Sequence, residues 1–368
     1  MTATKIGLLD IPRQTAAIRA ELDAAIARVL DHGKFILGPE VGALEERTAE
    51  YCGTRFAIGC ASGSDALLLA LMGFGVGRGD RVVTTPFTFF ATAGSIHHLG
   101  AVPVFVDIDP VTFNMDPALL EDALKAGAKA VMPVHLFGQC AGMDEINGIA
   151  ARHGVPVIED AAQAIGAEYR GRRAGSLGAC GCFSFFPTKN LGGFGDGGMM
   201  TTDDEDLAAR LRMLRVHGSR VKYYHEAVGI NSRLDTLQAA ILTVKMRHLD
   251  EWTERRRANA AAYREFLAGS RVQLPVEAAG MKHVYNQFTI RVQNRDEVRR
   301  GLTESGIGNE VYYPVPLHLQ ECFAYLGYKA GDLPFSEASA REVISLPIES
   351  GVSREDIAAV CERLTELV

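Results

Sequence analysis

The chain has 368 residues, more than the roughly 250 to 300 at which one hydrophobic core usually stops growing, so the length predicts two domains. It carries 38 Lys and Arg against 45 Asp and Glu, for a net charge of −7, and no basic stripe, which argues against nucleic acid as a partner. The seven cysteines are scattered and odd in number, and the N-terminus has no apolar signal core, so we expect a reducing cytoplasm, no disulfide framework and no metal site.

Short β-branched or aromatic runs alternate with helical patterns between about residues 55 and 160, which is typical of βαβ units and a mainly parallel sheet. An uncharged stretch from Val82 to Val106 approaches membrane-spanning length, but prolines and histidines divide it into strand, helix and strand, so we expect no membrane span. The expected strands are 56–60, 81–85, 102–107, 129–135 and 155–159, and the expected helices include 65–72, 117–125 and 143–153.

Beyond residue 160 the pattern predicts a strand at 182–186, a glycine-rich loop, a strand at 199–202 and a charged helix. One long helical pattern, from about 234 to 267, then leads into a β-like run at 284–292 and further helices. We therefore predict a large domain over residues 1–250 and a small C-terminal domain over residues 251–368.

The glycine-rich loop contains the pattern G-x-G-x-x-G at Gly193, Gly195 and Gly198. A dinucleotide-binding fingerprint leaves a buried strand and opens a helix, whereas this segment runs into a strand. We interpret it as a loop whose glycines permit close backbone approach.

Two charged residues fall where an α/β sheet places its ligands. Asp160 ends the strand at 155–159, although a lone Asp there more often caps the next turn. Lys189 follows the bulky apolar strand at 182–186, where partial desolvation could make its amine neutral and nucleophilic, although a lone lysine there is more often an ordinary surface residue.

Two further segments, at 63–65 and 88–92, add to the evidence from Asp160 and Lys189, although none of these features is sufficient alone. The backbone N–H groups of Gly63, Ser64 and Asp65 begin a helix and could cradle a phosphate, or simply form an ordinary cap. The segment 88–92 offers an aromatic face, which could equally belong to the core. A Schiff-base lysine, an acid for a pyridine nitrogen, a phosphate cup and a stacking ring together indicate a pyridoxal phosphate site.

With these motifs in order, the chain resembles the DegT/StrS-type sugar aminotransferases, which belong to the fold type I, aspartate-aminotransferase-like pyridoxal phosphate enzymes. The resemblance implies an α/β fold, with a mainly parallel central sheet flanked by helices in the large domain and a smaller C-terminal α+β domain. The matching segments are 38–41, 62–66, 88–92, 103–109, 159–163, 184–189, 195–198 and 229–235.

The resemblance also implies a role for each matching position. Lys189 is the lysine that forms the internal aldimine, and Asp160 is the partner of the pyridine nitrogen. The other cofactor positions are Gly63, Ser64 and Ser184 for the phosphate, Phe89 for ring stacking, Gln163 for the ring hydroxyl and Asn231 for the phosphate of a neighbouring subunit. The last position implies a homodimer with shared active sites.

The activity implied by the resemblance is transfer of an amino group from L-glutamate to a nucleotide-linked keto-sugar. Segments 221–225 and 231–238 are most similar to members that act at C3, including a branch that aminates a UDP-linked hexuronic acid. A 4-keto-sugar aminotransferase stays open, as does a non-catalytic pyridoxal phosphate-binding regulator. The related dehydratases usually replace the lysine with His, so Lys189 argues against that branch.

Three residues are candidates for substrate contact. Arg233 could pair with a carboxylate or diphosphate, although an ion pair with Asp235 or Glu226 is the alternative. Tyr313 and His318 lie in the segment 312–318, which resembles one that often begins His-Tyr-Pro in the family. Here Tyr312 stands in place of that His, so no sugar contact is carried over to it.

Overall fold

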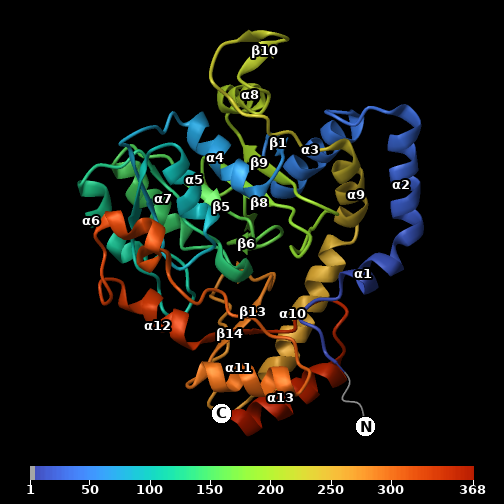
Figure 1. Cartoon of the computed structure of the whole chain (residues 1–368), viewed down its shortest axis with the longest axis vertical. Helices are drawn as coiled ribbons and strands as arrows, with labels where there is room; N and C mark the ends of the chain where they lie inside the picture. The colour runs from blue at the N-terminus through green and yellow to red at the C-terminus, as the bar shows by residue number, and fades with distance from the viewer. Residues whose placement is uncertain (1–4) are drawn as a thin grey trace.

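The computed structural model describes residues 5–368 and contains a central mixed sheet with helices on both faces (Figure 1). Parallel pairing joins β3, β2 and β4, and isolated bridges continue from the β4 segment to β5 through Val131 with Val157 and Val134 with Asp160. β5 pairs in parallel with β8, whereas β9 is antiparallel to both β8 and β1. The strands of this sheet are β1 (Phe56–Cys60), β2 (Arg81–Thr84), β3 (Val102–Phe105), β4 (Ala130–Val131), β5 (Ile158–Asp160), β8 (Cys180–Ser184) and β9 (Gly198–Thr202).

Successive residues of these strands belong to two different hydrophobic clusters. Val83 and Phe183 pack in one cluster, while Val82 and Cys182 pack in the other. Because neighbouring side chains on a strand point to opposite faces, both faces of the sheet are covered. One face carries α3 (Pro39–Cys52), α6 (Leu120–Lys125), α7 (Met143–Arg152) and α9 (Thr236–Met246), and the other carries α4 (Gly63–Gly73), α5 (Ala91–His98) and α8 (Glu205–Leu214).

The long helical pattern predicted at 234–267 is wrong as a single helix. It forms α9 and α10 (Leu249–Phe266), which are separated at Arg247 and His248. α9 packs against the sheet and against α2 (Arg19–His32), whereas the far end of α10 packs in a separate C-terminal cluster. Because of this break, α9 and the far end of α10 bury their apolar side chains in different clusters.

The C-terminal part contains a two-stranded antiparallel sheet of β13 (Phe288–Arg291) and β14 (Val343–Leu346), with α11 (Arg295–Glu304) and α13 (Arg354–Leu367) beside it (Figure 1). Together with the end of α10, these elements form one apolar cluster. α12 (Pro334–Glu342) returns to the large sheet, where the Asp107 carboxylate accepts hydrogen bonds from the backbone N–H of Phe335 and Ser336. The predicted fold class is confirmed, while the domain boundary stays a prediction.

Shorter elements lie around this framework. A hairpin of β10 (Ser219–Val221) and β11 (Tyr224–His225) projects from the end of the molecule, beyond α8 (Figure 1). Within residues 5–368, no helix is both long and apolar enough to cross a bilayer. The remaining elements are α1 (Ile11–Ala17), η1 (Pro117–Leu119), η2 (Leu136–Gly138), β6 (Glu168–Tyr169), β7 (Arg172–Arg173), β12 (Met281–Lys282), η3 (Leu317–Leu319) and η4 (Glu321–Leu326).

Candidate active site

The candidate site lies at the edge of the sheet where the strands β1, β2, β5 and β8 end. The residues expected to react follow these ends, because the turn after β1 leads to Gly63, β5 ends on Asp160, and β8 leads through Ser184 to Lys189. β9 runs the other way, so its first residue, Gly198, lies at the same edge opposite Ser184. The topology therefore gathers residues from distant parts of the chain.

Asp160 is 4% exposed, and both of its carboxylate oxygens have partners. The Thr92 hydroxyl donates to Oδ2 at 2.7 Å, and the backbone N–H of Ala162 donates to Oδ1 at 3.2 Å. Burial raises the pKa of Asp160, while these two hydrogen bonds and the charge of Lys189 oppose the rise. The carboxylate is thus fixed in direction and more basic than one in water.

Lys189 lies in the turn after β8, where its backbone N–H donates to the carbonyl of Phe186 at 2.9 Å. Part of the residue stays exposed, but the surrounding protein desolvates the amine and lowers its pKa to about 8. The negative charge of Asp160 works against this shift, which places the two side chains in one electrostatic environment. Near neutral pH a useful fraction of the amine is neutral and able to accept a proton.

An anion cradle lies where α4 meets the end of β8. Ser62 caps α4 by accepting the backbone N–H of Asp65 at 3.1 Å, and within residues 5–368 the first-turn N–H groups of Gly63 and Ser64 have no acceptor. A Cβ on Gly63 would lie only 2.5 Å from the Cβ of Ser184, so this glycine lets the Ser184 hydroxyl stand beside those amides. The arrangement fits a phosphate group.

The amide of Gln163 is held in one orientation. Its Oε1 accepts the backbone N–H of Phe137 at 2.7 Å, and its Nε2 donates to the Tyr313 hydroxyl at 3.0 Å. The ring of Phe89, which is 56% exposed, lies 6.3 Å from the ring of Tyr313 between centroids. An N–H of Gln163 and the face of Phe89 therefore border the same site, as a planar ring with a hydroxyl requires.

The glycine loop after Lys189 matches its interpretation as a close-packed turn. A Cβ at Gly198 would collide with the Ser62 carbonyl, and the loop enters a strand rather than a helix. The loop is fastened to α9, because Gln238 Oε1 accepts the N–H of Phe194 at 2.7 Å and Lys245 Nζ donates to the Gly192 carbonyl at 2.6 Å. Burial lowers the pKa of Lys245 to about 8 as well, so Lys189 is not distinguished by its pKa alone.

The sequence analysis missed Thr92 and the second role of Tyr313, and each of these residues orients a predicted one. Thr92 holds Asp160 and lies 3.0 Å from the Thr88 hydroxyl, and Tyr313, predicted as a substrate contact, also holds Gln163. The threonine pair had a visible signal in its spacing of four residues, whereas the contact between Gln163 and Tyr313 spans 150 residues and had none.

Asn231 and Arg233 flank Ser232, whose hydroxyl donates to Asp65 Oδ2 at 2.7 Å and accepts the backbone N–H of Ala61 at 3.1 Å. Asn231 is exposed, and its backbone forms a bridge with Val216. The alternative ion pair of Arg233 is not formed, since no carboxylate within residues 5–368 lies within salt-bridge distance and Glu226 pairs with Arg220 instead. The roles of both residues stay predictions.

His318 is 1% exposed, and its Nε2 lies 3.2 Å from Glu337 Oε1. It presents almost no surface to a sugar in this structure, and a part in substrate binding stays a prediction. Within residues 5–368, no cluster of three or more His, Cys, Asp or Glu side chains is arranged to hold a metal ion.

Comparison with known proteins identifies relatives along nearly the whole chain. The model of the DegT/DnrJ/EryC1/StrS aminotransferase family matches residues 16–365. A "Pleiotropic regulatory protein" of Geobacillus stearothermophilus is 52% identical over 98% of both chains. The UDP-2-acetamido-2-deoxy-3-oxo-D-glucuronate aminotransferase of Pseudomonas aeruginosa is 45% identical over 98% of this chain and 99% of its own. Among solved structures, DesV of S. venezuelae superposes with a TM-score of 0.96 at 46% identity over 98% of both chains.

Proposed function

The chain belongs to the DegT/DnrJ/EryC1/StrS aminotransferase family, and we propose that it moves an amino group from L-glutamate to C3 of a nucleotide-linked keto-sugar. The family is that of pyridoxal phosphate-dependent sugar aminotransferases, so the enzyme class and the cofactor follow from membership. The observation that carries the proposal is the gathering, at one edge of the sheet, of the buried Asp160 held by Thr92, the Lys189 segment after β8, and the anion cradle at the start of α4.

We assign the cofactor to residues whose geometry suits each of its parts. The N–H groups of Gly63 and Ser64, with the Ser184 hydroxyl, would hold the phosphate. Phe89 would cover one face of the ring. Gln163 has its Oε1 occupied by Phe137, so it would offer an N–H to the ring hydroxyl oxygen.

The catalytic residues would divide the proton chemistry between them. Bound pyridoxal phosphate supplies an electron sink for the negative charge that develops at the reacting carbon. Lys189 would hold the cofactor and, as a neutral amine, take the proton from Cα of the amino donor. Asp160, made more basic by burial and aimed by Thr92, would keep the proton on the ring nitrogen.

The C3 position and the sugar class rest on sequence similarity. The Pseudomonas aeruginosa relative is named for a 3-oxo sugar substrate, which supports C3 over C4. Arg233, which has no carboxylate partner within residues 5–368, would pair with a diphosphate or a carboxylate, and Tyr313 and His318 are the other proposed substrate contacts. The alternative is amination at C4.

We further propose a cytoplasmic homodimer with shared active sites. Phe35, Ile36 and Leu37 are each more than 40% exposed although apolar, and the Phe35 carbonyl accepts the N–H of Thr236 at 3.0 Å, which places this surface beside the segment of Asn231. Three consecutive exposed apolar side chains at this place fit burial against a second subunit. Asn231 would then reach the phosphate of the neighbouring site.

A non-catalytic regulator is the competing function, supported by the name of the Geobacillus stearothermophilus relative. Incubation of the cofactor-loaded protein with L-glutamate separates the two, since only a transaminase releases 2-oxoglutarate. The substrate is then tested with UDP-, dTDP- and GDP-linked 3-keto and 4-keto sugars, read by mass spectrometry. Amination of a 3-keto sugar is expected, and exclusive amination of 4-keto sugars would refute the C3 assignment.

A further inference from the structure

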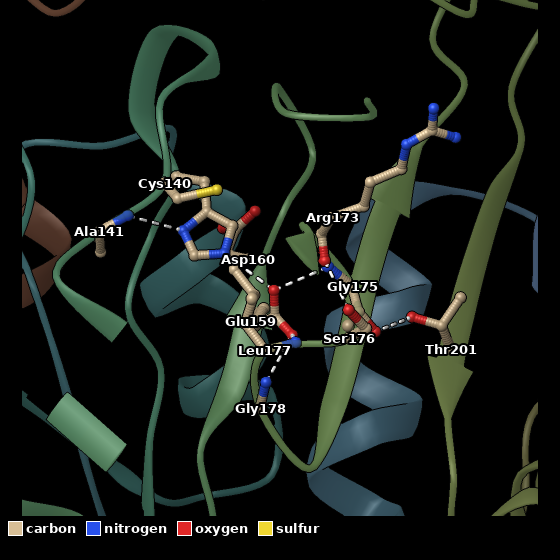
Figure 2. A network of polar contacts seen from close by, with 12 residues as sticks. Cys140, Ala141, Glu159, Asp160, Arg173, Gly175, Ser176, Leu177, Gly178 and Thr201 are labelled. Atoms are coloured by element: carbon tan, nitrogen blue, oxygen red, sulfur yellow. Dashed lines mark hydrogen bonds and ion pairs between the residues drawn. The ribbon is translucent and has the colours of Figure 1, made fainter. Parts of the chain in front are cut away.

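Directly before Asp160, the fully buried carboxylate of Glu159 accepts four hydrogen bonds (Figure 2). Oε1 accepts the backbone N–H groups of Leu177 and Gly178, both at 2.7 Å. Oε2 accepts the N–H of Gly175 at 2.7 Å and lies 2.9 Å from Nε2 of His135. Three of these partners are backbone donors, so the group is arranged to act as an acceptor at both oxygens, as an ionised carboxylate does.

The hydrogen bonds of His135 fix its tautomer. Its Nδ1 accepts the backbone N–H of Ala141 at 3.1 Å, so that nitrogen carries no proton. The single ring proton must then lie on Nε2, where it is donated to Glu159. The side chain of His135 is fully buried, so its neutral ring is a fixed link between Glu159 and the segment 135–141.

This segment touches both residues that we assign to the cofactor ring. The backbone N–H of His135 donates to the Asp160 carbonyl at 2.9 Å. Phe137, held at a positive φ of 58°, donates its N–H to Gln163 Oε1. A side chain rarely adopts this conformation without support from its surroundings. The other side of Glu159 holds the loop at 175–178, which leads into β8 and so toward Lys189.

We propose that Glu159, acting through the neutral His135, is a positioning residue that sets Asp160 and Gln163 for the cofactor ring. The inference rests on the proposed cofactor site. Successive residues of a strand point to opposite faces, so Glu159 faces away from the side of β5 on which Asp160 lies and acts only through its neighbours.

Glu159→Gln tests the proposal because it keeps the shape and removes an acceptor. The introduced amide must turn its NH₂ group toward donors in either orientation. At the place of Oε1 it faces the N–H groups of Leu177 and Gly178, and at the place of Oε2 it faces the N–H of Gly175 and forces His135 to choose between this amide and the N–H of Ala141. We expect the dissociation constant for pyridoxal phosphate to rise roughly tenfold to hundredfold. In the apo-protein, the ¹⁵N signals of His135 should show a second tautomer in the molecules whose amide turns its NH₂ group toward the ring.

The matched control is Glu121→Gln, which makes the same change in a partly exposed pair where Glu121 Oε1 lies 2.8 Å from His153 Nε2. This variant should bind pyridoxal phosphate as the wild type does. If Glu159 contributes only to stability, the Glu159→Gln variant will unfold at a lower temperature but bind pyridoxal phosphate normally when affinity is measured well below that temperature. That outcome would overturn the proposal.

His135→Asn provides a second variant if Glu159→Gln does not fold. Asparagine keeps an acceptor for the N–H of Ala141 but is too short to reach Glu159, so it cuts only the link. A folded His135→Asn protein that binds pyridoxal phosphate within twofold of wild type would refute positioning by this link, and a roughly tenfold loss would support it. A wild-type protein that does not bind pyridoxal phosphate would instead refute the proposed function, and this inference with it.

Discussion

Substitution of Gly63 by Ala tests the anion cradle by pure geometry. The new Cβ would lie 2.5 Å from the Cβ of Ser184, whereas ordinary contact begins at 3.4 Å, so α4 and β8 must separate by 3.4 − 2.5 = 0.9 Å. Overpacking of this kind lowers the free energy of unfolding by about 1–3 kcal/mol. Replacing a helical glycine with alanine raises it by about 0.5–1 kcal/mol, which offsets part of that loss. The free energy of unfolding should therefore fall by up to about 2.5 kcal/mol.

Cofactor affinity should fall more clearly than stability. A displacement of this size misaligns the amides of Gly63 and Ser64 from the Ser184 hydroxyl, and loss of one hydrogen bond to a charged group costs about 1.5–3 kcal/mol. Because about 1.4 kcal/mol corresponds to tenfold, the dissociation constant for pyridoxal phosphate should rise roughly tenfold to hundredfold.

The assay is a fluorescence titration of apo-protein with pyridoxal phosphate, combined with thermal unfolding. Gly148→Ala is the matched control, because Gly148 lies within α7 and its Cβ would meet no atom within 4 Å. The control should bind the cofactor normally and be as stable as the wild type or slightly more so. Binding of pyridoxal phosphate to the Gly63→Ala variant within twofold of wild type would refute the cradle.

Three further predictions concern the charged groups. Because burial lowers the pKa of Lys189 to about 8, the rate at which apo-protein attaches pyridoxal phosphate should rise with pH through about 8 and then level off; a rate that climbs without a bend toward pH ~10 would indicate an ordinary lysine. Asp160→Asn should still bind the cofactor but transfer the amino group of glutamate roughly 10²–10³-fold more slowly, as measured by 2-oxoglutarate release, and near-normal turnover would remove Asp160 from the mechanism. Thr92→Val removes a hydrogen bond that opposes the raised pKa of Asp160, so the apo-protein should lose about 1.5–3 kcal/mol of stability at pH ~8 and less as the pH falls and the carboxyl becomes protonated; equal losses at pH ~8 and at low pH in chemical denaturation would contradict this reasoning.

Local patterns were enough to predict that Asp160 and Lys189 follow strands that end at one edge of the sheet. Asp160 and Lys189 each follow an apolar strand, and parallel topology brings such strand ends together. The N–H groups of Gly63, Ser64 and Asp65 were expected at the start of a helix, and α4 begins at Gly63 with Ser62 as its cap. The close approach of Gly63 to Ser184 joins distant segments and had no signal in the sequence.

The parts that could not be predicted depend on contacts between distant residues. The apolar period continues through Arg247, so the sequence showed no break between α9 and α10, and the break follows from the different clusters that they join. The partners of Glu159 come from two separate segments. Glu159 precedes Asp160 on a buried strand. Nothing in the sequence around it indicates the four hydrogen bonds that its carboxylate accepts.

The central claim is that Lys189 and bound pyridoxal phosphate together carry out amino transfer, and one comparison tests it directly. Cofactor-loaded wild-type, Lys189→Ala and Lys245→Ala proteins are each incubated with L-glutamate, and the 2-oxoglutarate released is measured. Lys245 is the matched control because burial also lowers its pKa to about 8, yet its amine is bound to the Gly192 carbonyl. We predict about one equivalent per site from the wild type and from Lys245→Ala, and none from Lys189→Ala. Release from Lys189→Ala equal to that from wild type, or no release from any of the three, would contradict the account.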